Sequence, residues 1–143
     1  MVAGYCYDWI SKANTQKTDI NFPEFNFHQP WNFSNESYLW SIKTDSVREV
    51  GCIHTCQGLE LDYVGVIIGQ DLIWRDGQVL VNPAKRSKGD STLKGYKTML
   101  QNDPNRARNL AKQIIKNTYR TLMTRGMKGC YVWCEDAELN HYI

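Results

Sequence analysis

Apolar residues in this chain fall into several short continuous runs and one long stripe at helical spacing. The short runs are Val2–Tyr7, Val50–His54, Asp62–Gly69 and Cys130–Cys134. Near-continuous apolar runs are typical of parallel strands that are covered on both faces. The pattern therefore predicts an α/β fold with a mostly parallel sheet, in which Cys52–Thr55 and Tyr63–Ile68 are the central strands.

Local turn and cap signals divide the rest of the chain. Asp103-Pro104 predicts the start of a helix that runs from Asn105 to about Thr124, with Asp as the cap and Pro in the first position. Gly126 and Gly129 predict its end and separate it from the next strand. Asp76-Gly77, between two apolar triplets, predicts a hairpin. The polar tail, residues 135–143, is expected to form one or two helical turns.

The composition narrows the class of protein. With 143 residues, 42% of them hydrophobic and 22% charged, the chain suits a single globular domain over residues 1–143 rather than a disordered segment. The net charge of +2 is too small to indicate nucleic-acid binding by itself. No apolar run reaches the ~18 residues of a membrane span, and the first residues do not read as a signal peptide. We therefore expect no membrane partner and a cytoplasmic location.

Two segments each leave two interpretations open. Aromatic residues alternate with turn formers between Phe22 and Trp40, and these rings either fill a satellite core or form a base-stacking surface. The satellite core is favoured because no lysine or arginine lies among them. The basic segment from Lys85 to Lys97 is either a solvated insertion loop or a phosphate contact made by residues such as Lys85, Arg86 and Lys88.

The cysteines bear on redox state and on metal binding. They are Cys6, Cys52, Cys56, Cys130 and Cys134. An odd number of cysteines in apolar segments favours reduced, buried thiols in a cytosolic protein. Two Cys-x-x-x-Cys pairs, with His54 nearby, leave a small zinc-binding module as an alternative, although zinc knuckles usually have two residues between their cysteines. We therefore expect free thiols and no metal.

The segment Cys52-Ile53-His54-Thr55-Cys56-Gln57-Gly58-Leu59-Glu60-Leu61-Asp62, here called the 52–62 segment, carries the most chemistry. Gly58 permits close approach of the backbone to a phosphate or sugar. Glu60 can accept hydrogen bonds from ribose hydroxyls, and Gln57 suits a phosphate or a water. Each residue also has a plain structural role, as a turn, a solvated cap or, for His54, a satisfied core residue. Only their combination indicates a ligand site.

Arg125 stands at the end of the predicted helix, in the segment Tyr119-Arg120-Thr121-Leu122-Met123-Thr124-Arg125-Gly126, here called the 119–126 segment. An arginine at a helix C-terminus interacts favourably with the helix dipole, which is its structural role. The functional alternative is an arginine finger that neutralises charge on a transferring phosphoryl group.

These two segments resemble motifs of the superfamily 1 helicases. The 52–62 segment is similar to motif V over eleven positions, and the 119–126 segment is similar to motif VI, whose Thr-Arg pair matches Thr124-Arg125. Nearly all of the chain resembles the C-terminal part of a bacterial and phage family of uncharacterised P-loop ATPases, which is related to the helicase domain of group 3 Schlafen proteins. The resemblance implies a RecA-like fold and an ATP-dependent, helicase-like nucleic-acid motor or remodeller.

The resemblance also implies roles for individual residues. Gly58 approaches the terminal phosphate of ATP, Glu60 meets the ribose, and Arg125 stabilises the γ-phosphate. Gln57 and Thr124 belong to the same nucleotide site, while His54 and Thr55 lie near the channel for single-stranded DNA or RNA. The chain departs from the helicase pattern at Cys52, where motif V usually has Thr, and at Arg120-Thr121, where motif VI usually has Tyr-Val.

What the sequence lacks shapes the expected function. It contains no Gly-x-x-x-x-Gly-Lys-Ser/Thr and no strand ending in an Asp-Glu pair, so it offers no cradle for the β- and γ-phosphates and no ligand for Mg²⁺. By the resemblance, ATP and Mg²⁺ require a preceding P-loop ATPase domain, and this chain alone is expected to be inactive. The alternative from another class is a non-catalytic adaptor domain that binds protein or nucleic acid.

Overall fold

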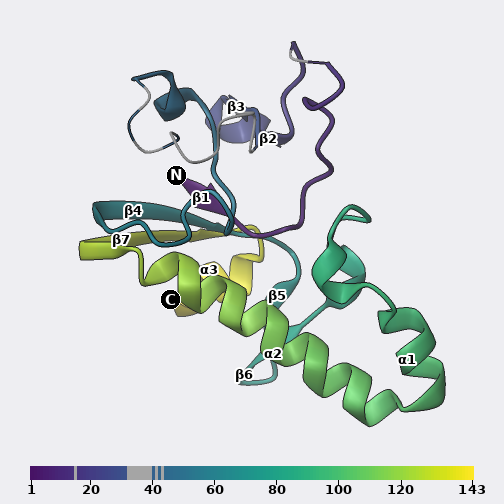
Figure 1. Ribbon diagram of the computed structural model, residues 1–143. Helices are drawn as coiled ribbons and strands as arrows, with labels where there is room; N and C mark the ends of the chain where they lie inside the picture. Colours follow the sequence, from purple (N-terminus) through teal and green to yellow (C-terminus); the bar gives the residue numbers. More distant parts are fainter. Residues whose placement is uncertain (15, 32–39, 41, 43) are drawn as a thin grey trace.

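The structure, a computed structural model, describes residues 1–14, 16–31, 40, 42 and 44–143. Its central feature is a three-stranded parallel sheet (Figure 1). The strands lie in the order β1 (Val2–Ala3), β4 (Leu61–Ile68) and β7 (Gly126–Cys134). The predicted α/β class with a parallel sheet is therefore confirmed. The central strand is β4, whose apolar sequence suits a position between two neighbours and two covered faces.

The helix α2 (Pro104–Met123) covers one face of this sheet (Figure 1). It begins as predicted, because the Asp103 side chain accepts a hydrogen bond of 3.0 Å from the backbone N–H of Arg106 and Pro104 occupies the first helical position. Its buried residues are Ala107, Ala111, Ile115, Thr118, Tyr119 and Leu122. Three of these, Ile115, Tyr119 and Leu122, join Val64, Val66 and Ile68 of β4 in the larger of two apolar cores.

Two antiparallel hairpins flank the sheet. β5 (Leu72–Arg75) and β6 (Gln78–Val81) pair across Asp76 and Gly77, whose φ angles of 51° and 74° place both in the left-handed region. Two such residues in succession are the signature of a tight hairpin turn, so the predicted hairpin is confirmed. The second hairpin is β2 (Ile20–Phe22) with β3 (Phe27–Gln29).

The aromatic N-terminal region packs on the opposite face of the sheet from α2. Trp31 is buried, Phe22 and Phe27 are partly buried against the second apolar core, and Phe22 lies 4.5 Å from Trp133 between ring centroids. The satellite-core interpretation is confirmed for these rings. Trp40 is buried in the larger core, whereas Phe25 is 62% exposed, so the satellite-core interpretation does not hold for Phe25. Phe33 and Tyr38 lie outside the described residues.

Short helices complete the chain. They are α1 (Tyr96–Asn102) and α3 (Ala137–Tyr142), with 3-10 turns η1 (Pro23–Phe25), η3 (Thr44–Arg48), η4 (Pro83–Lys85) and η5 (Ser91–Leu93). The predicted C-terminal helical turns are confirmed by α3, which is capped by the Asp136 side chain. The sequence did not predict α1, because its seven residues show no long apolar stripe.

The predicted strand over Val50–His54 is wrong. Val50 and Gly51 make only isolated bridges, to Trp31 and Val2, and the chain then turns. The Thr55 hydroxyl accepts a hydrogen bond of 2.6 Å from the Cys52 backbone N–H and donates one of 2.8 Å to the Cys52 carbonyl. Threonine side chains that bond to nearby backbone compete with strand pairing, and this local bonding explains the turn.

The second correction concerns the glycines after α2. Gly126 and Gly129 lie within the nine-residue strand β7 instead of separating helix from strand. The pairing of β7 with β4 is irregular between Leu61 and Tyr63. A Cβ atom on Gly126 would lie 2.2 Å from the Gly129 carbonyl oxygen, so the irregular backbone leaves no room for a side chain there.

Candidate functional site at the amino edge of the sheet

The amino ends of β4 and β7 bring the 52–62 and 119–126 segments together. Leu61, the first residue of β4, pairs with Gly126, the first residue of β7. The Leu61 backbone N–H donates a hydrogen bond of 2.9 Å to the Arg125 carbonyl. Glu60 and Arg125, which precede these paired residues, therefore lie at the same edge of the sheet although 65 positions separate them in the sequence.

Arg125 connects the end of α2 to this edge. Its Nε donates to the Thr121 carbonyl at 3.2 Å, and one terminal nitrogen makes a longer contact of 3.4 Å to the Leu59 carbonyl. The first contact satisfies an orphan carbonyl of the last helical turn, which is the expected capping role. A guanidinium carries five N–H donors, so other donors have no partner among the described residues. Arg125 thus caps the helix and keeps N–H donors that a ligand could use.

The 52–62 segment turns beside Arg125, with Cys52, Thr55 and Cys56 buried and the part around Gly58 exposed. Gly58 has a φ of 78°, in the left-handed region, and nothing lies within 4 Å of where a Cβ atom would be. Glycine is therefore needed here for its backbone conformation and not for space. Gln57, Gly58 and Glu60 are all exposed. Thr124 is exposed as well, and its hydroxyl donates to the Thr121 carbonyl at 3.1 Å.

The structure separates the residues expected near a nucleic-acid channel. His54 is exposed, with its ring 6.0 Å from that of Tyr5. Thr55 is buried, and its hydroxyl is used by the Cys52 backbone. Lys85 and Lys88 are exposed. A surface ligand can therefore reach His54 and the two lysines, but not the Thr55 hydroxyl.

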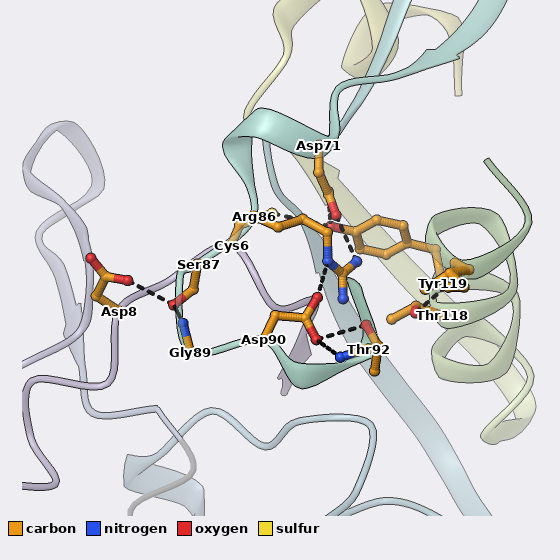
Figure 2. A network of polar contacts seen from close by, with 11 residues as sticks. Cys6, Asp8, Asp71, Arg86, Ser87, Gly89, Asp90, Thr92, Thr118 and Tyr119 are labelled. Carbon is orange, nitrogen blue, oxygen red and sulfur yellow. Dashed lines mark hydrogen bonds and ion pairs between the residues drawn. The ribbon is translucent and has the colours of Figure 1, made fainter. Parts of the chain in front are cut away.

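Arg86 differs from its basic neighbours because its side chain is only 3% exposed. Its guanidinium donates to Asp71 at 3.0 Å and forms a short ion pair with Asp90 (Figure 2). The Tyr119 hydroxyl donates to Asp71 at 2.5 Å and accepts a bond of 3.0 Å from the Gly69 backbone N–H. These contacts form the carboxyl-edge network, defined by Asp71, Arg86, Asp90 and Tyr119. The Arg86 guanidinium is buried in this network and is therefore not available to a phosphate at the surface.

The carboxyl-edge network lies just beyond the end of β4, at the opposite edge from Glu60. Burial raises the pKa of the Asp71 carboxyl, and bonds from Tyr119 and Arg86 oppose that rise. Burial also raises the pKa of the Tyr119 phenol well above its ordinary value. A Cβ atom on Gly4 would lie 2.4 Å from the Tyr119 hydroxyl oxygen, so this glycine makes room for the network.

Sequence reasoning did not identify the carboxyl-edge network. Asp71 and Tyr119 are 48 residues apart, and neither stands in a charge pattern that reveals the other. The available signal was Asp71 itself, a carboxylate two residues after the apolar run that ends at Gly69. A carboxylate that follows a buried strand directly is a candidate for burial with a cationic partner.

Other chemistry is limited among the described residues. No group of three or more His, Cys, Asp or Glu side chains comes together there as metal ligands would. All five cysteines are free, and burial raises the pKa of the Cys56 and Cys134 thiols to about 11. No helix in the described part of the chain is long and apolar enough to cross a membrane.

Comparison with known proteins identifies the family. The family model described as Schlafen group 3, DNA/RNA helicase domain, matches residues 1–136. An uncharacterized protein of Saccharomyces cerevisiae is 31% identical over 104 residues, which cover 73% of this chain and 22% of the relative. The chain thus spans about a fifth of that relative's length. No solved structure matches. The 143-residue chain, matched over nearly its whole length, belongs to the Schlafen group 3 DNA/RNA helicase domain family.

Proposed function

We propose that this domain is the second, RecA-like half of an ATP-dependent, helicase-like motor or remodeller of nucleic acid. The family match supports a helicase-like function. The observation that carries the proposal is the 2.9 Å bond from the Leu61 N–H to the Arg125 carbonyl. That bond holds Glu60 and Arg125 at one accessible edge of the sheet, where a nucleotide bound to another domain can meet both.

In this proposal each residue at the amino edge has a chemical role. Glu60 accepts hydrogen bonds from the ribose hydroxyls, and the backbone at Gly58 approaches the phosphates closely. The spare guanidinium donors of Arg125 neutralise charge that develops on the γ-phosphate. Gln57 and Thr124 supply further hydrogen bonds from the two sides of the same edge.

ATP and Mg²⁺ require a partner in this proposal. The exposed edge holds candidates for the ribose contact and for the arginine finger, but the chain has no P-loop sequence to cradle phosphates. We propose that a preceding P-loop domain, in the same natural chain or as a separate subunit, completes the site. A cytoplasmic location belongs to the same proposal, as does a contact of His54, Lys85 and Lys88 with single-stranded DNA or RNA.

Steady-state ATPase assays test the proposal. The 143-residue chain alone should show no hydrolysis, and the longer protein that contains the P-loop domain should hydrolyse ATP. In that protein Glu60→Ala should raise KM for ATP by about 10- to 100-fold, the scale of a lost hydrogen bond to a charged group. Asp62→Ala is the matched control, because Asp62 is an exposed carboxylate two residues away that pairs with Lys128.

Three results would count against this function. Robust hydrolysis by the isolated chain would show that no second domain is needed. Equal KM values for Glu60→Ala and Asp62→Ala would show that Glu60 makes no contact with the ribose. Absence of hydrolysis in the longer protein would favour the adaptor function, in which the exposed edge binds a protein or nucleic acid without turnover.

A further inference from the structure

The small net charge of the chain hides a strong separation of charge. Residues 85–125 hold eleven of the seventeen lysines and arginines but only two of the fifteen aspartates and glutamates. The formal charge of this segment is +9, and that of the rest of the chain is −7. The two acids within the segment are Asp90, which is buried against Arg86, and Asp103, which caps α2. Neither of them neutralises the outer surface of α2.

The positive charge is arranged regularly on α2. The helix contains no acidic residue between Pro104 and Met123. Four exposed cations recur at every fourth position and form the basic stripe: Arg108, Lys112, Lys116 and Arg120. Four exposed amides recur in the same way and form the amide row: Asn105, Asn109, Gln113 and Asn117. Residues four apart are neighbours on a helix face, ~6 Å apart along the axis.

Helix stability does not explain the basic stripe. Like charges four residues apart destabilise a helix, and the first turn of α2 lacks the acidic residues that the helix dipole favours there. Arg75, Arg86 and Lys128 do have carboxylate partners, which are Asp136, Asp71 and Asp62. No carboxylate among the described residues forms an ion pair with a member of the basic stripe. The stripe therefore suits a negatively charged ligand from outside the chain.

We propose that the basic stripe and the amide row bind the phosphate backbone of a nucleic acid strand, at a surface separate from the exposed His54 of the 52–62 segment. Lysine and arginine neutralise phosphates, and asparagine and glutamine donate hydrogen bonds to phosphate and sugar oxygens. Such contacts carry no base specificity. This inference rests on the nucleic-acid part of the proposed function and is independent of its ATP site.

The composition of α2 favours nucleic acid over a membrane surface. A helix that lies on a membrane exposes an apolar face to the lipid. The apolar face of α2 is instead used by the sheet, with Ile115 and Leu122 fully buried. The row beside the basic stripe contains amides in place of the leucines or aromatic residues that would enter a bilayer.

The stripe also has a useful position relative to the candidate ATP edge. It ends at Arg120, about one helical turn before Thr124 and Arg125. A strand bound along α2 would therefore extend from the region of α1 toward the edge that holds Glu60. Binding along this path places nucleic acid on the outer face of the same helix whose C-terminal end leads to the candidate nucleotide edge.

Fluorescence anisotropy of the 143-residue chain with a labelled oligodeoxynucleotide of mixed sequence, without ATP, tests this inference. The stripe variant is Arg108→Gln/Lys112→Gln/Lys116→Gln. The matched control, Lys12→Gln/Lys17→Gln/Arg48→Gln, also removes two exposed lysines and one exposed arginine. Three lost phosphate contacts should lower the slope of log K against log salt by ~2 for a single strand. The ratio of the wild-type association constant to that of the stripe variant should then fall about 20-fold between about 50 and about 200 mM salt.

The control should keep the wild-type slope. Equal losses of affinity in the two variants would show that only net charge matters. No binding by the wild type at about 50 mM salt would contradict the proposed surface. Phosphatidylserine vesicles replace the oligonucleotide in a parallel assay, and stripe-dependent binding to vesicles alone would overturn the proposal in favour of a membrane. Urea unfolding should show the stripe variant at least as stable as wild type, which separates lost binding from lost folding. Failure of these tests leaves the ATPase tests of Glu60 and Arg125 unaffected.

Discussion

At the carboxyl end of the parallel sheet Asp71, Arg86 and Tyr119 are buried and bonded to one another, whereas at the amino end Glu60 is exposed and Arg125 bonds only to backbone carbonyls. Both edges combine an acidic residue with an arginine. At the carboxyl edge Arg86 and its two carboxylate partners, Asp71 and Asp90, satisfy one another, so these side chains are not available to a ligand. At the amino edge they remain available.

The comparison shows that exposure and spare donors distinguish a candidate site from a structural network. A buried charge that loses its partner is strongly destabilising, because water cannot replace that partner. An exposed charge that loses its partner is resolvated at little cost. The two edges should therefore respond oppositely to mutation: the carboxyl edge through stability, and the amino edge through activity.

The largest effect on stability is expected for Asp71→Ala. This change leaves the buried Arg86 without one of its two carboxylates and leaves the Tyr119 hydroxyl without its acceptor. We expect a loss of ~3–5 kcal/mol in the free energy of unfolding, measured by urea titration. The control Asp62→Ala breaks an exposed ion pair and should cost less than ~1 kcal/mol. Similar losses in the two variants would contradict the structural role of the carboxyl-edge network.

A smaller effect is expected for Tyr119→Phe. The variant keeps the ring but removes the donor to Asp71 and the acceptor for the Gly69 N–H. Leaving these buried groups unsatisfied should cost ~1–3 kcal/mol in thermal or urea unfolding. Tyr131→Phe, at a side chain that is 71% exposed, should leave stability unchanged. A stability change of the same size at both tyrosines would show that burial of the Tyr119 hydroxyl does not explain its effect.

Asp136→Asn should cost less stability than Tyr119→Phe, because Arg75 is 42% exposed and solvent screens the pair although Asp136 itself is buried. The hydrogen bond from Arg75 holds the pKa of Asp136 below its ordinary value. The stabilisation is therefore present above the ordinary carboxyl pKa and is lost as pH falls through the lowered pKa of the folded state. The difference in unfolding free energy between wild type and variant should shrink on acidification below about pH 4. A difference that grows on acidification would contradict this assignment.

The smallest effects on stability are expected at the amino edge. Glu60→Gln should change the free energy of unfolding by less than ~0.5 kcal/mol, as is usual for surface substitutions. Arg125→Ala removes a contact at a helix C-terminus and should cost only ~0.3–1 kcal/mol. Urea titration of the isolated chain checks both values. A loss as large as that of Asp71→Ala would show that the amino edge is a structural network as well.

Local signals in the sequence predicted the elements whose boundaries are set by neighbouring residues. Asp103-Pro104 begins α2, Asp76-Gly77 makes the hairpin turn, and the apolar runs at β4 and β7 form the parallel sheet. Each of these depends on cap, turn or burial preferences that act within a few residues. The resemblance to helicase motifs identified the two segments that meet at the amino edge.

The expected strand at Val50–His54 failed for a local reason, because the Thr55 hydroxyl bonds to the Cys52 backbone and turns the chain. Tertiary contacts decided the other features that the sequence could not show. Arg86 was expected among surface cations, but its burial depends on Asp71, fifteen residues away. Likewise, no sequence pattern indicated that Gly4 makes room for Tyr119. These features depend on which residues the fold brings together.

Arg125→Ala in the longer protein that contains the P-loop domain tests the central claim, that the amino edge is an ATP half-site. The account predicts a fall in kcat of roughly 10³-fold or more, with ATP binding less affected, because an arginine finger acts mainly on charge in the transition state. Arg125→Lys should rescue poorly, since an ammonium lacks the planar fork. Arg106→Ala, at an exposed arginine of α2, is the control and should keep wild-type kcat. Wild-type turnover by Arg125→Ala would show that this arginine is only a helix cap.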